Sequence, residues 1–122
     1  MLARTLPLAL LLAPPLRAQT TEFASVPVPG LVGAGAAATA ALSGDGLHVT
    51  FEAVREGGAP SRDVFLRDLA NGTTTWVSRP MIAGSTGIGG GAASPSFDGR
   101  LVAFHAVGEG LLALDANGSN YD

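Results

Sequence analysis

The alternation of apolar and polar positions along the chain indicates short β-strands separated by turns. Two runs, Leu47–Ala53 and Asp63–Leu69, are rich in β-branched, leucine and aromatic side chains and follow turn-forming residues. A third run, Thr73–Ser78, comes directly after Asn71-Gly72. Because Asn and Gly accept the positive φ angles of a type I′ turn, the second and third runs are expected to form a hairpin. The three runs together predict one antiparallel sheet.

A short segment of the chain recurs at a constant offset of 53 residues. Ser43–Phe51 and Ser96–Phe104 carry the same residue at five of nine positions, namely Ser, Asp, Gly, Val and Phe. In both copies an Asp-Gly turn leads into a strand that ends near a phenylalanine. The chain therefore contains at least two copies of one structural unit.

Each unit is expected to contain one further strand. Its position is hard to read from the sequence, because the segments that could form it are rich in glycine. For the first unit we expect it at Ser25–Val28 or at Ala37–Leu42, and for the second unit at Met81–Ala83. The glycine-rich stretches Gly30–Ala41 and Gly84–Ala93 precede the two Asp-Gly turns at nearly the same spacing. We interpret both stretches as connections between units, where small residues allow close passage of the backbone.

The first 18 residues have the features of a secretory signal peptide. Arg4 is followed by the apolar run Leu6–Leu12, and small Ala18 provides a cleavage point. The apolar run is shorter than the roughly 20 residues that a membrane-spanning helix needs. Pro14 and Pro15 also interrupt a helix, because proline lacks a backbone donor. We expect cleavage after Ala18 and a periplasmic or secreted protein.

Composition excludes several classes of function. The net charge is −3, and all seven basic residues are arginine. Binding to nucleic acid requires clustered Lys or Arg, so no nucleic-acid partner is expected. The chain contains no cysteine, which excludes disulfides and thiolate metal sites but is compatible with export.

Taken in order, four motifs resemble the TolB-like, WD-type β-propeller repeats of exported bacterial proteins. The resemblance extends over 40–122. Its motifs are Ser43-Gly-Asp-Gly46, Asp63-Val-Phe-Leu-Arg-Asp68, Ala70-Asn-Gly-Thr-Thr74, and Pro95-Ser96 before Asp98-Gly99. The second Asp-Gly turn is about two residues shorter than the family pattern, and the loop before Asp63 lacks the usual Asp or Asn.

The resemblance implies an all-β fold made of β-propeller blades, each a four-stranded antiparallel sheet. On this basis the chain is a fragment of about two blades. We expect a signal peptide at 1–18, a strand or linker at 19–39, a first blade at 40–83 and a truncated second blade at 84–122.

One loop, 115–122, resembles loops that bind calcium in some members of the family. Its candidate ligands are Asp115, Asn117, Ser119 and Asp122, which would offer hard oxygen atoms around a bend at Gly118. Such atoms suit Ca²⁺, which takes roughly six to eight oxygen ligands. The loop is one residue longer than the family pattern before Asp122. A turn with solvated acidic residues is the alternative interpretation. No other cofactor is expected.

The remaining polar residues form no catalytic pattern. His48 and His105 occupy non-equivalent positions in the two copies, and no His-Glu-x-x-His motif is present. Ser43 and Ser96 belong to the repeated turns and not to a Gly-x-Ser-x-Gly elbow. No catalytic residue is therefore assigned, and a catalytic role is disfavoured.

Two acidic residues and one aromatic residue of the first unit have structural interpretations. Asp63 and Asp68 are five residues apart, so they lie on opposite faces of a strand and do not form a carboxylate pair. Asp68 is expected to cap the following turn, and Asp63 is expected to bind the turn backbone. Trp76 is expected in the core or between blades.

The sequence therefore predicts an exported repeat protein that acts as a scaffold for a protein, glycan or other ligand of the cell envelope. The alternative is the propeller domain of a larger exported hydrolase or lyase, whose catalytic residues lie outside this fragment. No membrane-spanning segment is expected in the fragment.

Overall fold

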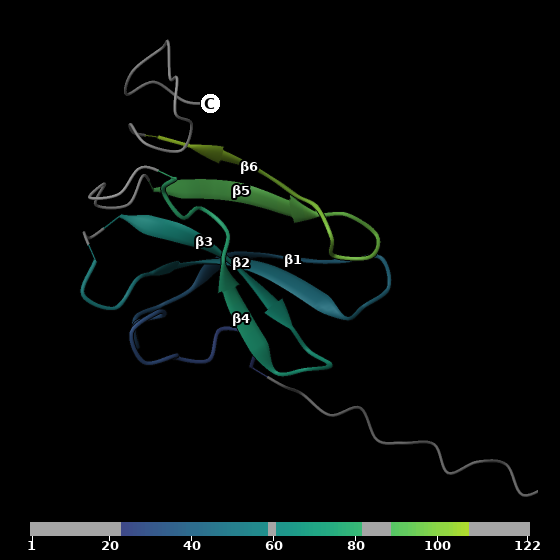
Figure 1. Cartoon of the computed structure of the whole chain (residues 1–122), viewed down its shortest axis with the longest axis horizontal. Coiled ribbons are helices and arrows are strands. Elements are labelled where there is room, and N and C mark those ends of the chain that lie inside the picture. The colour runs from purple at the N-terminus through teal and green to yellow at the C-terminus, as the bar shows by residue number, and fades with distance from the viewer. Residues whose placement is uncertain (1–22, 59–60, 82–88, 108–122) are drawn as a thin grey trace, which may run out of the picture.

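The structure is a computed structural model, and it describes residues 23–58, 61–81 and 89–107 (Figure 1). Within these ranges the chain forms β-strands and no helix, which confirms the predicted all-β class. The described residues accordingly include no helix that is long and apolar enough to cross a membrane. The strands are β1 (Ala38–Leu42), β2 (His48–Val54), β3 (Arg62–Asp68), β4 (Thr73–Trp76), β5 (Gly90–Pro95) and β6 (Val102–Ala106).

Strands β1 to β4 form one antiparallel sheet in the order of the sequence. The three strands predicted from alternation agree with β2, β3 and β4 to within two residues at each end. Strand β1 lies at Ala38–Leu42, so the second of the two predicted positions is confirmed. In the other position, only Val28 makes an isolated bridge, to Val32. We refer to β1–β4 as the first unit.

Strands β5 and β6 form a separate antiparallel pair, here named the second unit. The strand that pairs with β6 is Gly90–Pro95; the strand predicted at Met81–Ala83 lies, after Met81, outside the described residues. The interpretation of Gly84–Ala93 as a connection is corrected, since its last four residues belong to β5. Likewise, the stretch Gly30–Ala41 ends inside β1. Glycine and alanine in these strands allow β5 to lie close to β1, β2 and β3.

The two units share an irregularity that sequence similarity does not reveal. The register of β1 against β2 shifts between Ala38 and Ala41, and Thr39 in this bulge has a φ of 44°. The register of β5 against β6 shifts between Gly91 and Ser94, and Ala92 has a φ of 50°. These positions are again 53 residues apart, so the repeat includes the same β-bulge.

The turn between β3 and β4 differs from the predicted type I′ turn. It spans four residues, Leu69–Gly72, and within it only Gly72 has a positive φ, of 66°. The carboxylate of Asp68 closes this turn by accepting hydrogen bonds from the backbone N–H of Asn71 at 2.9 Å and from its side-chain amide at 2.7 Å. The prediction that Asp68 caps the turn is confirmed.

Cross-strand pairing gives the first unit two distinct faces. Face A contains Phe51, which pairs with Phe65, and Phe65 in turn pairs with Trp76. The two phenyl rings stack with centroids 5.6 Å apart. Face B contains Thr50 and Glu52, and the second unit lies against it through β5. Each face of this sheet is therefore covered.

Face A is covered by residues 23–33, which we call the covering segment. Its Val32 is buried against Phe51 and Phe65 and so completes the core, while Val28 and Leu31 pack at the edge. At the end of β2 the amide of Gly33 donates to the carbonyl of Val54 at 3.0 Å. Figure 1 shows the covering segment and the β5–β6 pair on opposite sides of the four-stranded sheet.

Candidate functional site

The turn between β1 and β2 is held together by hydrogen bonds of a serine and an aspartate. The hydroxyl of Ser43 donates to the carboxylate of Asp45 at 2.6 Å and accepts the backbone N–H of His48 at 2.9 Å. The same Asp45 oxygen accepts the backbone N–H of Leu47 at 2.9 Å. Gly46 provides the positive φ, 73°, that the turn requires.

The turn between β5 and β6 repeats this network atom for atom. Ser96 donates to Asp98 at 2.8 Å and accepts the N–H of Leu101 at 3.1 Å, while Asp98 accepts the N–H of Arg100 at 3.1 Å. Gly99 has a φ of 68°. The Ser-x-Asp-Gly motif is therefore a hydrogen-bonded turn in both units, as the sequence predicts.

The two turns lie against each other, which sequence reasoning missed. The backbone N–H of Asp45 donates to the carbonyl of Phe97 at 2.9 Å. The ring of Phe97 lies over Gly44, where a Cβ atom would overlap it, and Gly99 lies against the side chain of His48. Gly44 lies inside the repeated motif, but a contact between distant turns has no signal in the sequence.

The joined turns form a surface that we call the turn surface, comprising Leu42–Leu47 and Ser96–Leu101. Phe97 and Leu101 are each 74 % exposed, and Leu42 and Leu47 are also exposed. Beside them a shallow pocket of about 330 Å³ is lined by Ser96, Asp98, Arg100 and Leu101. The turn surface combines apolar side chains with a carboxylate and a guanidinium group, which is a composition suited to binding a protein or a sugar.

Hydrogen bonds within the turns control the charge of this surface. The hydroxyl of Ser43 and then the backbone N–H of Leu47 lower the pKa of Asp45 below its ordinary value. The pKa of Asp98 is lowered in the same way, first by Ser96 and then by the N–H of Arg100. Donors that stabilise the carboxylate favour the charged form. Both aspartates are therefore anionic at neutral pH.

The residues of the first turn do not form a catalytic triad, although Ser43, Asp45 and His48 lie together. In a triad the histidine accepts the proton of the serine, but here the hydroxyl of Ser43 points to Asp45. Ser43 is also buried, and the second turn keeps its Ser-Asp pair with Leu101 in place of His48. The arrangement stabilises a turn.

A second polar cluster is buried on face A. The hydroxyl of Ser78 donates to Asp63 at 2.9 Å and accepts both the N–H of Val64 at 3.0 Å and the indole N–H of Trp76 at 3.1 Å. The guanidinium of Arg55 lies 4.5 Å from the centre of the Trp76 ring and 3.8 Å from Asp63. Burial outweighs these contacts and raises the pKa of Asp63. The cluster is a structural network that joins β3 to the residues after β4.

The structure separates the two aspartates that the sequence already placed on opposite faces. Asp63 lies opposite Ala53 on face A, whereas Asp68 lies opposite His48 on face B. Asp63 binds the side chain of Ser78 rather than the turn backbone, so that part of the prediction is wrong. Trp76 packs against the core, as expected.

The predicted calcium ligands Asp115, Asn117, Ser119 and Asp122 lie outside the described residues. Among the residues at 23–58, 61–81 and 89–107, no group of three or more His, Cys, Asp or Glu side chains is arranged to hold a metal ion. His105 is an exposed residue of β6, and His48 lies between Asp45 and Asp68 at 3.7 and 4.0 Å.

Comparison with protein-family models, curated proteins and solved structures gives no match to this chain.

Proposed function

We propose that the chain is part of an exported β-propeller scaffold that binds a protein or glycan partner through the turn surface. The observation that carries this proposal is the junction of two equivalent turns, in which Phe97, Leu101 and Leu47 are exposed, with Leu42 exposed at the adjoining end of β1. Several exposed large apolar side chains in two joined turns are characteristic of an interaction site.

The repeated geometry supports the propeller part of the proposal. Both units contain the same bulge and the same hydrogen-bonded turn, and β5 lies against face B of the first unit. In a propeller, small residues in the innermost strands allow neighbouring blades to approach closely, and β1 and β5 are rich in alanine and glycine. An experimental structure in which the units radiate from one axis would support the propeller. Units that stack along a straight axis would contradict it.

The binding role is tested by replacing the exposed apolar side chains of the turn surface. A photo-crosslinking residue at Leu47 is expected to label an envelope protein or glycan in cells that export the protein. Phe97→Ser and Leu101→Ser should reduce this labelling at least tenfold with an unchanged melting temperature, because both side chains are exposed. Met81→Ser, at a 75 % exposed position outside the turn surface, is the matched control. Labelling that is unaffected by the turn variants would contradict the proposal.

Export and calcium binding complete the proposal and rest on the sequence. In a bacterial host, the exported product should begin at Gln19, as measured by amino-terminal sequencing; a product that retains residues 1–18 would contradict cleavage after Ala18.

Titration with Ca²⁺ should raise the melting temperature of the wild-type chain, and Asp115→Ala should abolish the increase. If calcium leaves the melting temperature of both chains unchanged, the loop is an ordinary turn.

A further inference from the structure

The contact between the two units joins unlike surfaces. The first unit contributes face B, where the hydroxyl of Thr50 donates to the carbonyl of Ala93 at 3.2 Å. In the same contact the bulge amide of Ala92 donates to the carboxylate of Glu52 at 2.9 Å. Because the contact is heterologous and the units are equivalent, each unit also possesses the surface that the other one uses.

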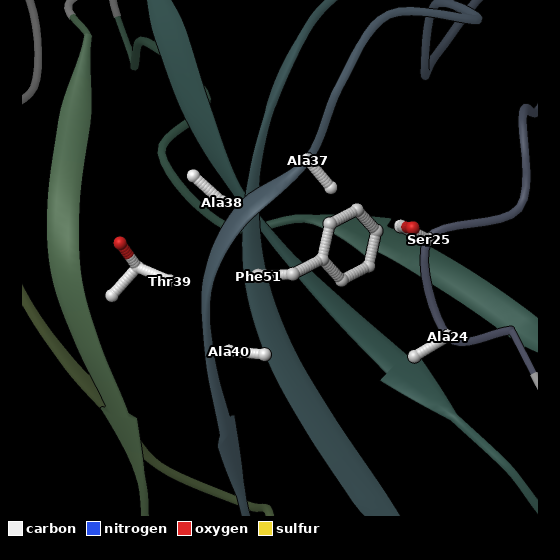
Figure 2. A pocket seen from close by; sticks show the side chains of 7 residues that line it. All are labelled: Ala24, Ser25, Ala37, Ala38, Thr39, Ala40 and Phe51. Atoms are coloured by element: carbon white, nitrogen blue, oxygen red, sulfur yellow. The ribbon is translucent and has the colours of Figure 1, made fainter.

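The first unit has on β1 the same kind of surface by which β5 of the second unit contacts the first unit. Residues Ala37–Ala40 are the equivalents of Gly90–Ala93, and Phe51 is the equivalent of Phe104. Ala93 is buried by the contact between the units, whereas Ala40 is exposed. In place of a neighbouring unit, Ala37–Ala40 and Phe51 line a pocket of about 270 Å³ (Figure 2).

The second unit retains the complementary surface on β6. Ala103 and His105 are the equivalents of Thr50 and Glu52, and both are exposed, whereas Ala106 is buried. Since side chains alternate along a strand, Ala103 and His105 lie on the side of β6 opposite to that of Ala106. Thr50, by contrast, is completely buried by its contact with β5.

The covering segment occupies face A of the first unit but fits it incompletely. Ala24 and Ser25 form the far wall of the 270 Å³ pocket, and Figure 2 shows the ring of Phe51 between them and β1. The segment contacts the sheet through one isolated bridge, from Val32 to Arg55, rather than as a strand of its own. Its other backbone hydrogen bonds are mainly within the segment, at Val28, Leu31 and Val32. A segment without a ladder of hydrogen bonds to the sheet opens at lower free energy than the core strands.

We propose that face A of the first unit is a docking surface for the repeat itself, covered reversibly by residues 23–33. Its occupant is a second copy of this chain, which docks through the exposed side of β6. The new contact continues the one between the first and second units, so copies add head to tail. This self-docking involves different residues from the turn surface and does not depend on the proposed binding of a partner there.

The test loosens the covering segment of the full chain and leaves the four residues of the core cluster, Val32 among them, unsubstituted. Val28 and Leu31 pack at the edge of the core, and Val28→Asp/Leu31→Asp should release the segment. Sedimentation velocity is then expected to show a mass that rises with protein concentration through the dimer and beyond. Phe23→Asp/Val26→Asp adds the same charge to exposed positions of the same segment and should leave the chain monomeric. A released variant that stays monomeric with an unchanged circular dichroism spectrum would overturn the proposal.

A substitution on the other surface distinguishes specific docking from aggregation. Adding Ala103→Arg to the released variant should restore the monomer, because the side of β6 that docks would carry a bulky charge. Mixing this triple variant with an equal amount of the wild-type chain should give a one-to-one complex. Association that Ala103→Arg does not change would overturn the proposal. Should the Asp variants lose their β-sheet spectrum, Val28→Thr/Leu31→Ala replaces them, and the same outcomes decide.

Discussion

Opposing electrostatic effects act on single acidic side chains in this fold, and Asp63 is the clearest case. Hydrogen bonds from Ser78 and Trp76 and the charge of Arg55 favour its carboxylate, but burial favours its neutral form more strongly. Asp45, Asp68 and Asp98 lie in exposed turns, where donors dominate and lower their pKa values. Acidic residues of one small protein therefore contribute to stability with opposite dependence on pH.

Replacement of Asp63 by Asn should show this opposite dependence. Because the folded-state pKa of Asp63 lies above 3.8, the folded chain binds more protons than the unfolded chain between the two pKa values. The stability contributed by this carboxyl is present below pH 3.8 and is lost as the pH rises through the folded-state pKa. Asp63→Asn should therefore gain stability relative to the wild type as the pH increases, measured by urea unfolding at a series of pH values.

Two control variants make the result specific. Asp45→Asn should behave in the opposite way, because the pKa of Asp45 is lowered and its contribution is present above 3.8 and lost as the pH falls below it. Asp63→Ala should cost about 1–3 kcal/mol more than Asp63→Asn at every pH, since Asn keeps an acceptor for the buried hydroxyl of Ser78 and Ala does not. If Asp63→Asn and Asp45→Asn change with pH in the same direction, burial does not dominate at Asp63.

The glycines of the two turns provide a matched pair of substitutions. Gly46 and Gly99 have φ angles of 73° and 68°, so alanine at either position costs roughly 1–2 kcal/mol of backbone strain. A Cβ at Gly46 meets open space, whereas one at Gly99 overlaps the side chain of His48. Gly99→Ala should therefore destabilise the chain more than Gly46→Ala in thermal unfolding. In a His48→Ala background this difference should become smaller, because the imidazole ring is removed while the Cβ of residue 48 remains 2.8 Å from the added atom. An unchanged difference would show that the two turns do not pack as described.

At the scale of elements, the β-bulge is the feature that both units share most closely. Thr39 and Ala92 adopt left-handed φ angles that are unfavourable for residues with a Cβ atom. Substitution by glycine removes roughly 1–2 kcal/mol of strain and costs about 0.5–1 kcal/mol in chain entropy. Thr39→Gly and Ala92→Gly should each stabilise the chain by up to about 1 kcal/mol, measured by urea unfolding. Ala41→Gly, in the regular part of β1, should instead destabilise it, and equal losses in all three variants would contradict the bulge.

The strands that were predicted correctly from the sequence are those in which apolar and polar residues alternate strongly. β2, β3 and β4 carry β-branched and aromatic residues, and the Ser-x-Asp-Gly motif specifies a turn through local hydrogen bonds. β5 was missed because Gly90 and Gly91 have weak strand propensity, and it becomes a strand only by pairing with β6. The four-residue turn at Asn71 was missed because the capping carboxylate of Asp68 outweighs the preference of Asn-Gly for a two-residue turn. The contact between the turns depends on tertiary packing.

At the scale of the whole molecule, the first unit is a sheet with two unlike sides. Face A carries the aromatic core that receives Val32, beside the polar cluster of Asp63 and Ser78, whereas face B uses Thr50 and Glu52 to bind the backbone of β5. Hydrogen bonds between a side chain of one sheet and the backbone of the other fix how the two sheets are aligned, because a shift of β5 by one residue would separate both bonded pairs. The residues of the repeat therefore determine which face of a unit the next unit contacts.

The hydroxyl of Thr50 offers the most direct test of this stacking. It is completely buried and donates to the carbonyls of Ala41 at 3.3 Å and of Ala93 at 3.2 Å. Thr50→Val keeps the shape of the side chain but removes the donor, which should cost about 1–3 kcal/mol. Because Ala93 belongs to the second unit, amide hydrogen exchange should accelerate in β5 and β6 more than in β3 and β4. Thr75→Val, at an exposed position of β4, should change neither stability nor exchange. Uniform acceleration across all strands would mean that Thr50 supports the first sheet alone and does not join the two units.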